Sequence, residues 1–83
     1  MMHYEKLYVE VTARFTPEGC IIPLKVLWED GRYFLIDKIL DIRPAASLKA
    51  GGAGIRYTCR IGLKETYLFL EENRFFVEKI CKY

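Results

Sequence analysis

Residues 26–33 read Val-Leu-Trp-Glu-Asp-Gly-Arg-Tyr, and this stretch decides the fold class. Apolar and aromatic residues flank an Asp-Gly pair, which is a strong signal for a tight turn between two antiparallel strands. In the preceding segment, residues 20–28, alternation places four side chains on one face: Ile22, Leu24, Val26 and Trp28. Pro23 lacks an amide hydrogen, which places this strand at a sheet edge or at a bulge. We therefore expect a β-hairpin in which Trp28 anchors the core.

Further strands are predicted on both sides of this hairpin, at residues 7–15, 33–42, 55–61, 65–70 and 74–78. A helix over residues 7–15 would expose Val9 and Ala13, so alternation favours a strand there. Turn-forming residues separate the segments at 16–19, 29–32, 62–64 and 71–73. The apolar parity of residues 33–42 changes near Asp37-Lys38, which predicts a bulge. Residues 79–83 fit either a continued strand or a helical turn.

These segments predict an all-β fold with about six strands in an antiparallel meander. The length of 83 residues allows one domain, residues 1–83. A small sheet removes its exposed edges most simply by curling, so we expect a single, partly open SH3-like β-barrel. An OB-type barrel is the alternative, although such a barrel normally has a helix between strands. Cys20 and Cys59 are expected to be small buried apolar groups.

Two stretches carry a family resemblance: Val26–Tyr33 with Ile36–Leu40, and the aromatic ending Leu68–Val77. Over residues 20–78 the chain resembles small uncharacterised bacterial β-domains of the SH3-like barrel type. The resemblance implies an SH3-like fold and, because these domains have no assigned activity, no catalytic residues.

Composition narrows the possible functions. Apolar residues make up 52% of the chain and aromatic residues 14%, which predicts a folded core. No stretch has the roughly 20 apolar residues that cross a bilayer, and the first residues lack a signal-peptide core, so we expect a cytoplasmic protein without a membrane partner. The three cysteines form no Cys-x-x-Cys pair, and His3 is the only imidazole. This set predicts no metal site, no cofactor and no nucleophile–base pair, so we do not expect an enzyme.

Two further motifs favour structural interpretations. Residues 51–54 read Gly-Gly-Ala-Gly, but a strand rather than a helix follows them, unlike a phosphate-binding loop. Asp30, Asp37 and Asp41 lie close in sequence, but no further acidic or imidazole partner accompanies them. We interpret these carboxylates as turn and solvated strand residues.

The uneven distribution of charge is the main indication of function. Residues 25–64 hold eight basic and four acidic side chains, whereas the rest of the chain holds five basic and seven acidic ones. A basic face with aromatic platforms, such as Tyr8, is how small barrels bind single-stranded nucleic acid. We therefore predict a non-catalytic binding module whose nucleic-acid contacts come from the 43–56 loop and its neighbours: Arg43, Lys49, Arg56 and Arg60. The alternative is a protein-interaction or self-associating domain, which uses an exposed edge near Pro23 or surface aromatic residues to pair with another chain or to form a homo-oligomer.

Overall fold

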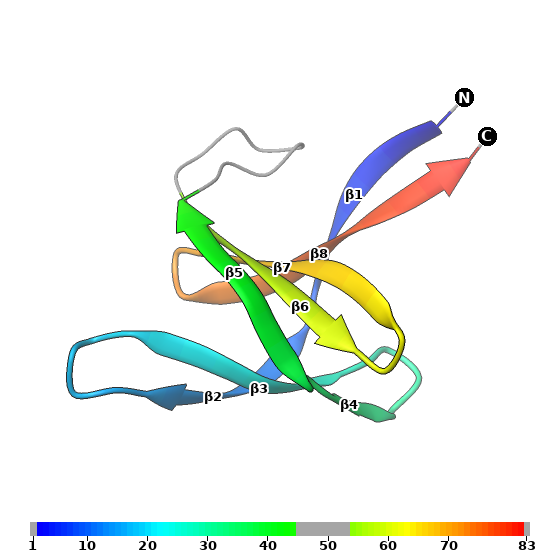
Figure 1. Cartoon of the computed structure of the whole chain (residues 1–83). Helices are drawn as coiled ribbons and strands as arrows, with labels where there is room; N and C mark the ends of the chain where they lie inside the picture. Colours follow the sequence, from blue (N-terminus) through cyan, green and yellow to red (C-terminus); the bar gives the residue numbers. More distant parts are fainter. Residues whose placement is uncertain (1, 45–53, 83) are drawn as a thin grey trace.

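The computed structural model describes residues 2–44 and 54–82, and these residues form eight β-strands and no helix. The strands are β1 (Met2–Tyr8), β2 (Glu10–Phe15), β3 (Ile21–Leu27), β4 (Tyr33–Leu35), β5 (Lys38–Pro44), β6 (Ile55–Ile61), β7 (Lys64–Glu71) and β8 (Arg74–Lys82). Every ladder between them is antiparallel. The predicted all-β, antiparallel class is confirmed (Figure 1).

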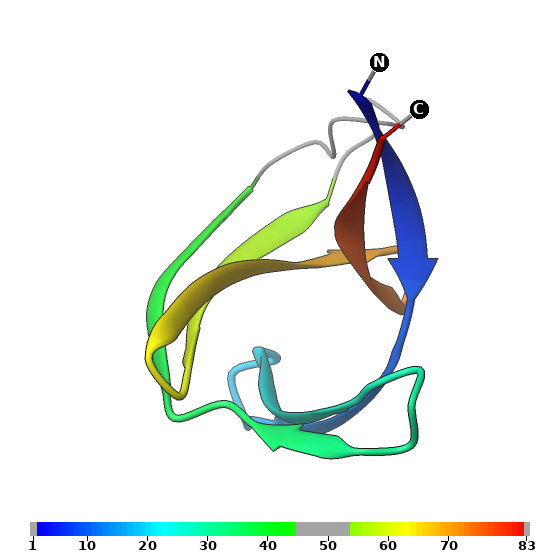
Figure 2. The ribbon, with the colours of Figure 1, turned by 90° about the vertical axis from the view of Figure 1, so that its right-hand side faces the viewer.

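The strands form two sheets that face each other. The larger sheet has the order β1-β8-β7-β6-β5, and the smaller has the order β2-β3-β4. Figure 2 shows the small sheet beneath the arch of the large one. The two sheets are not closed into one continuous sheet, so the structure shows the expected antiparallel all-β class as two layers.

The predicted count of about six strands is wrong because two predicted strands each serve both sheets. Residues 7–15 divide at Val9, whose amide donates to the carbonyl of Phe75 at 3.1 Å before the chain enters β2. Residues 33–42 divide at 36–37. The Ile36 amide donates to Leu24 of the small sheet, and the Asp37 amide donates to Arg60 of the large sheet, both at 2.9 Å. The chain thus changes sheets within one peptide unit.

The first and last strands lie together. β1 pairs with β8 from Met2 opposite Lys82 to Tyr8 opposite Phe76, so residues 79–82 continue the strand rather than forming a helical turn. The remaining strand predictions differ from the structure by a few residues at most. Residues 55–61 form β6 with the predicted bounds.

The central hairpin is confirmed in atomic detail. The Trp28 amide donates to the Arg32 carbonyl at 2.8 Å, and the Gly31 amide donates to the Trp28 carbonyl at 2.9 Å. Gly31 has a φ of 89°, a left-handed conformation in which a side chain would be strained. The Asp-Gly pair therefore forms a turn that closes β3 onto β4.

A bulge in β3 changes the face that we predicted for this strand. Thr12 lies opposite Lys25 and Ala13 lies opposite Pro23, so Leu24 is an extra residue. Pro23 is buried and Leu24 is 42% exposed, contrary to the predicted face. Of the two alternatives for the proline, the edge position is wrong because β3 is the central strand of its sheet, and the bulge is confirmed.

The core lies between the sheets. Its buried members are Val26, Tyr57, Cys59, Leu68 and Leu70. Trp28 is only half-buried and lies outside this cluster, so its predicted role as a core anchor is wrong. Trp28 follows the last residue of β3, where it lines an opening between the sheets. Cys59 is buried as expected, whereas Cys20, in the β2–β3 turn, is exposed.

Candidate nucleic-acid interface

The candidate site is the face of the large sheet that points away from the core, which we call the outer face. Residues directly opposite each other in a ladder share a face, so the registers define its members. They are Lys38, Asp41 and Arg43 on β5; Arg56, Thr58 and Arg60 on β6; Glu65, Tyr67, Phe69 and Glu71 on β7; Arg74, Phe76, Glu78 and Ile80 on β8; and Tyr4, Lys6 and Tyr8 on β1.

An aromatic cluster lies at the centre of the outer face. The rings of Phe69 and Phe76 stack with centroids 5.2 Å apart and planes 7° apart, and Phe76 is fully buried. Tyr8 and Tyr67 contact this pair edge-on, at 5.6 Å from Phe76 and 6.4 Å from Phe69 respectively. The cluster forms a second, smaller apolar centre on this face.

Lys6 covers the cluster. Its Nζ lies 4.5 Å from the centroid of the Phe76 ring and donates to Oε1 of Glu71 at 3.1 Å. That hydrogen bond, with the charge of Glu71, raises the pKa of Lys6. This cation is thus held by a carboxylate and a ring.

Two pairs of like charges lie opposite each other between β5 and β6. Lys38 faces Arg60, and Arg43 faces Arg56. Like charges at such positions destabilise a sheet. Arg60 is four positions after Arg56 along β6, so the two pairs are about 13 Å apart. Two cation pairs on one exposed face make an arrangement that a chain of phosphates would stabilise.

Asp41 and Tyr67 partly compensate the Arg43–Arg56 pair. Arg43 Nε donates to Asp41 Oδ2 at 2.6 Å, and this bond, with the charges of Arg43 and Arg56, lowers the pKa of Asp41. The Arg56 guanidinium carbon lies 4.4 Å from the centroid of the Tyr67 ring. Arg56 Nε is buried without a hydrogen-bond partner among the described residues. Ring stacking holds the Arg56 side chain in place.

Exposed tyrosines complete the site. Tyr67 is 50% exposed, and Tyr4 and Tyr8 are exposed to a similar extent. Tyr4 and Tyr67 line a hollow of about 400 Å³ together with Thr58, Glu65 and Glu78. Flat rings beside guanidinium groups are surfaces on which bases stack.

The structure brings together three of the four predicted contact residues. Arg43, Arg56 and Arg60 lie on adjacent strands of the outer face. Lys49 and most of the 43–56 loop, with its Gly51–Gly52–Ala53 motif, lie outside the described residues. Sequence reasoning missed Lys38 and Tyr67. Each is exposed at a strand position, but their juxtaposition with arginines depends on strand register.

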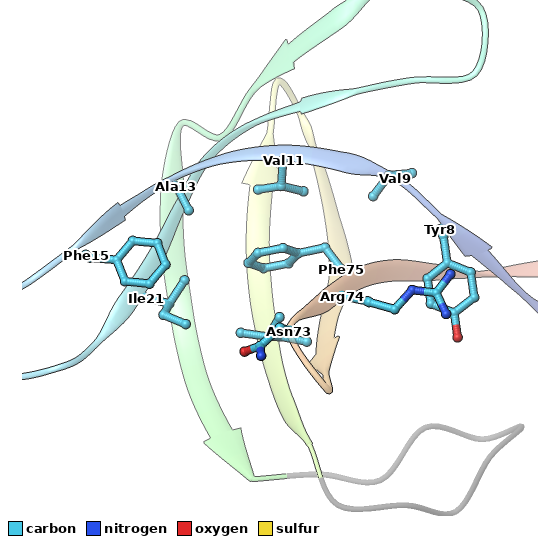
Figure 3. Close-up of a pocket in the computed structure, with 10 residues that line it drawn as sticks. Tyr8, Val9, Val11, Ala13, Phe15, Ile21, Asn73, Arg74 and Phe75 are labelled. Carbon is cyan, nitrogen blue, oxygen red and sulfur yellow. The ribbon is translucent and has the colours of Figure 1, made fainter.

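A different pocket, of about 780 Å³, opens beside β2 (Figure 3). Apolar side chains such as Val11, Phe15 and Phe75 point into it. At its rim the Arg74 guanidinium carbon lies 3.6 Å from the centroid of the Tyr8 ring. We interpret this pocket as an opening to the core, because the polar groups that line it do not converge on a common point.

The three aspartates each make a separate local contact. Asp30 bonds to Arg32 and Asp41 to Arg43, while Asp37 Oδ2 accepts from the Gly62 amide at 2.6 Å. Within residues 2–44 and 54–82, no group of three or more His, Cys, Asp or Glu side chains could hold a metal ion. Burial raises the pKa of the Cys59 thiol to about 11, which keeps it protonated and unreactive near neutral pH. No helix in this part of the chain is long and apolar enough to cross a membrane.

Comparison with known proteins finds no family model, no curated protein and no solved structure that matches this chain.

Proposed function

We propose that this domain is a non-catalytic module that binds single-stranded nucleic acid on its outer face. The two like-charged pairs, Lys38–Arg60 and Arg43–Arg56, carry this proposal. Phosphates would contact the paired cations, and bases would stack on Tyr67 and Tyr4. Single strands suit this arrangement better than a duplex, because only unpaired bases expose their ring faces to aromatic side chains.

We also propose that the fold is of the SH3-like type. Two bent segments, β1–β2 and β4–β5, each contribute to both sheets, as bent strands do in small partly open barrels. The absence of a helix among residues 2–44 and 54–82 favours this arrangement over an OB-type barrel.

A salt titration of binding tests the proposed function. Fluorescence anisotropy of a labelled 15-nucleotide single strand would compare the parent protein with Arg43→Ala/Arg60→Ala, which removes one cation from each pair. Both side chains are exposed, so the variant is expected to fold. The slope of log K against log salt should fall by about 1.4, or 0.7 for each phosphate that the variant no longer neutralises.

Arg14→Ala/Arg32→Ala is the matched control. It removes the same charge from the small sheet and its turn, and Arg32 has an ion pair with Asp30 like that of Arg43 with Asp41. This control should keep the parent slope. The proposal fails if the parent shows no salt-dependent binding at low ionic strength, or if the slope falls equally in both double variants.

A further inference from the structure

β7 and β8 form an incomplete ladder inside the large sheet. β7 pairs with β6 from Lys64 to Leu70, and β8 pairs with β1 from Phe76 to Lys82. Between each other they pair only over 69–71 and 74–76. Beyond that point the strands diverge, as Figure 1 shows to the right of the β7–β8 turn. We call the space between residues 64–68 and 77–82 the wedge.

Backbone groups of both strands point into the wedge. The Arg60 carbonyl accepts a hydrogen bond from the Asp37 amide, so the backbone groups of Arg60 face β5 and those of the β6 residues of opposite parity face β7. The residues of β7 that lie opposite that parity, Lys64, Thr66 and Leu68, therefore direct their backbone groups toward β6. The backbone groups of Glu65 and Tyr67 therefore face the wedge. On β8, the Phe75 carbonyl bonds to Val9, so the backbone of Ile80 faces away from β1 and toward the wedge. Both sides are regular strand edges that could accept another strand.

Three of the four outer edges of the two sheets, those of β2, β4 and β5, are less suited to strand addition, whereas β1 is a regular edge of seven residues. β4 has three residues, and β2 has a register shift against β3. β5 contains the extra residue Leu40 and ends at Pro44. Short, bulged or proline-containing edges resist pairing with another chain.

Pockets lie on both sides of the wedge. On the core side, a mainly apolar pocket of about 980 Å³ is lined by Val26, Trp28, Leu68 and Val77. On the outer face lies the hollow with Tyr4, Tyr67, Glu65 and Glu78. Thr66 and Glu78 line both pockets, so the two meet at the wedge.

We propose that the wedge binds an extended peptide of a partner protein by β-strand addition. Successive side chains of a strand point to opposite faces, so alternate residues of the peptide would enter the two pockets. The core-side pocket fits apolar side chains. The outer hollow, with two carboxylates and two tyrosine rings, fits arginine or lysine through charge and cation–π contacts. The peptide therefore alternates apolar and basic residues. This proposal does not rest on the proposed nucleic-acid binding, but both use the rings of Tyr4 and Tyr67, so the peptide and a nucleic acid would compete for the outer hollow.

The capped peptide Ac-(Val-Arg)4-NH2 tests this proposal on the full chain. Trp28 is the only tryptophan and lines the core-side pocket, so its emission should shift to the blue on binding. Amide hydrogen exchange at Glu65, Tyr67 and Ile80 should slow at least tenfold in the complex. Two peptides of the same composition are controls: one with four valines followed by four arginines, and one with N-methylated backbone. Both should bind at least tenfold more weakly.

Two variants of one exposed residue separate backbone pairing from charge. Glu65→Pro removes an amide that faces the wedge and leaves the bonds of β7 to β6 in place. Glu65→Ala removes only the carboxylate. The proline variant should weaken peptide binding at least tenfold, and the alanine variant no more than threefold. Equal binding by the alternating and block peptides would overturn the proposal, as would equal weakening in the two variants. Concentration-dependent dimerisation of the protein alone, with the same amides protected, would assign the wedge to a second copy instead.

Discussion

The Tyr57 hydroxyl donates a hydrogen bond to the Ile21 carbonyl at 2.6 Å, and this bond links the two sheets directly. Tyr57 lies on β6 of the large sheet and is almost fully buried, while Ile21 begins β3 of the small sheet. The two sheets are not closed into one, and apolar contacts between them are not directional. This hydrogen bond is directional, so it helps to fix how the sheets are placed relative to each other.

Tyr57→Phe removes that bond and leaves the Ile21 carbonyl without this partner. The bond is part-buried, and a hydrogen bond of this kind contributes about 0.5–1.5 kcal/mol, so the free energy of unfolding should fall by about this amount. Urea unfolding followed by circular dichroism measures the change. Tyr33→Phe, at an exposed ring, is the control and should change stability by less than about 0.5 kcal/mol. A Tyr57 variant as stable as this control would contradict the assigned role.

Alkaline pH should destabilise the protein through Cys59. Burial raises the pKa of this thiol from 9.0 to about 11, so between these values the unfolded chain loses a proton that the folded chain keeps. The free energy of unfolding is therefore unaffected well below pH 9 and falls as pH rises toward 11, by about 2–3 kcal/mol in total. Urea unfolding from pH 7 to 11 measures this fall.

Cys59→Ala isolates the contribution of this thiol. The variant is expected to be less stable at pH 7, but its stability should decline less between pH 9 and 11. Parallel pH profiles for the parent and the variant would show that Cys59 does not cause the decline.

Trp28→Ala should cost less than a core substitution. Its side chain is half-buried at the opening between the sheets, so we expect a decrease below about 2 kcal/mol rather than the 3–5 kcal/mol of a buried aromatic residue. Leu68→Ala, at a position 2% exposed, should cost about 2–5 kcal/mol and serves as the comparison. Urea unfolding followed by circular dichroism ranks the two, and a reversed order would restore Trp28 to the core.

Lys38→Glu should raise stability while it weakens nucleic-acid binding. The substitution replaces a like-charged pair with an opposite-charged pair facing Arg60, which favours the sheet by about 0.2–1 kcal/mol. Melting temperature and oligonucleotide anisotropy would be measured on the same samples. Arg14→Glu makes the same charge change on the small sheet and should leave affinity nearly unaltered. A higher melting temperature together with weaker oligonucleotide binding is the result expected if the like-charged pair lowers stability and binds anions. Unchanged binding would contradict this role.

Gly54→Ala should disturb the outer face. A methyl group there would collide with the Glu71 side chain and lie 3.0 Å from the Leu70 carbonyl oxygen. Glu71 binds Lys6, which covers the Phe76 ring, so the collision would reach the aromatic cluster. We expect a decrease of about 1–3 kcal/mol, the range for overpacking, in urea unfolding. Gly19→Ala is a useful comparison, because its effect comes from a φ of 88° in open space.

Strands and turns could be predicted from the sequence because their causes are local. Alternation predicted β6 with its bounds, and the Asp30-Gly31 pair predicted the central hairpin. The change of parity near Asp37-Lys38 predicted a bulge, but the bulge lies at Leu40 and the chain changes sheets at 36–37, because parity alone does not distinguish a bulge from a corner. The prediction that Trp28 is buried failed for a similar reason. The parity of the strand gives the face on which the side chain lies, but its distance from the core depends on how far the opposite sheet extends.

The candidate site shows the same division between local and non-local causes. Arg56 and Arg60 are two of the predicted contact residues because they alternate on one strand, which is a local pattern. That Arg43 faces Arg56 and Lys38 faces Arg60 depends on the bulge at Leu40, which shifts the register by one residue. Phe76 is buried on the face that points away from the main core, and nothing in its neighbours along the chain indicates this.

The pairing of β1 with β8 has a consequence for folding kinetics. Its partners are 68 to 80 residues apart in sequence, whereas the β6–β7 and β7–β8 hairpins close over two residues. Loop-closure entropy delays such distant contacts, so the C-terminal hairpins are expected to form first and the β1–β8 ladder last. Until that ladder closes, β8 exposes a long strand edge to other chains. The nascent protein is therefore most prone to aggregate before this ladder closes.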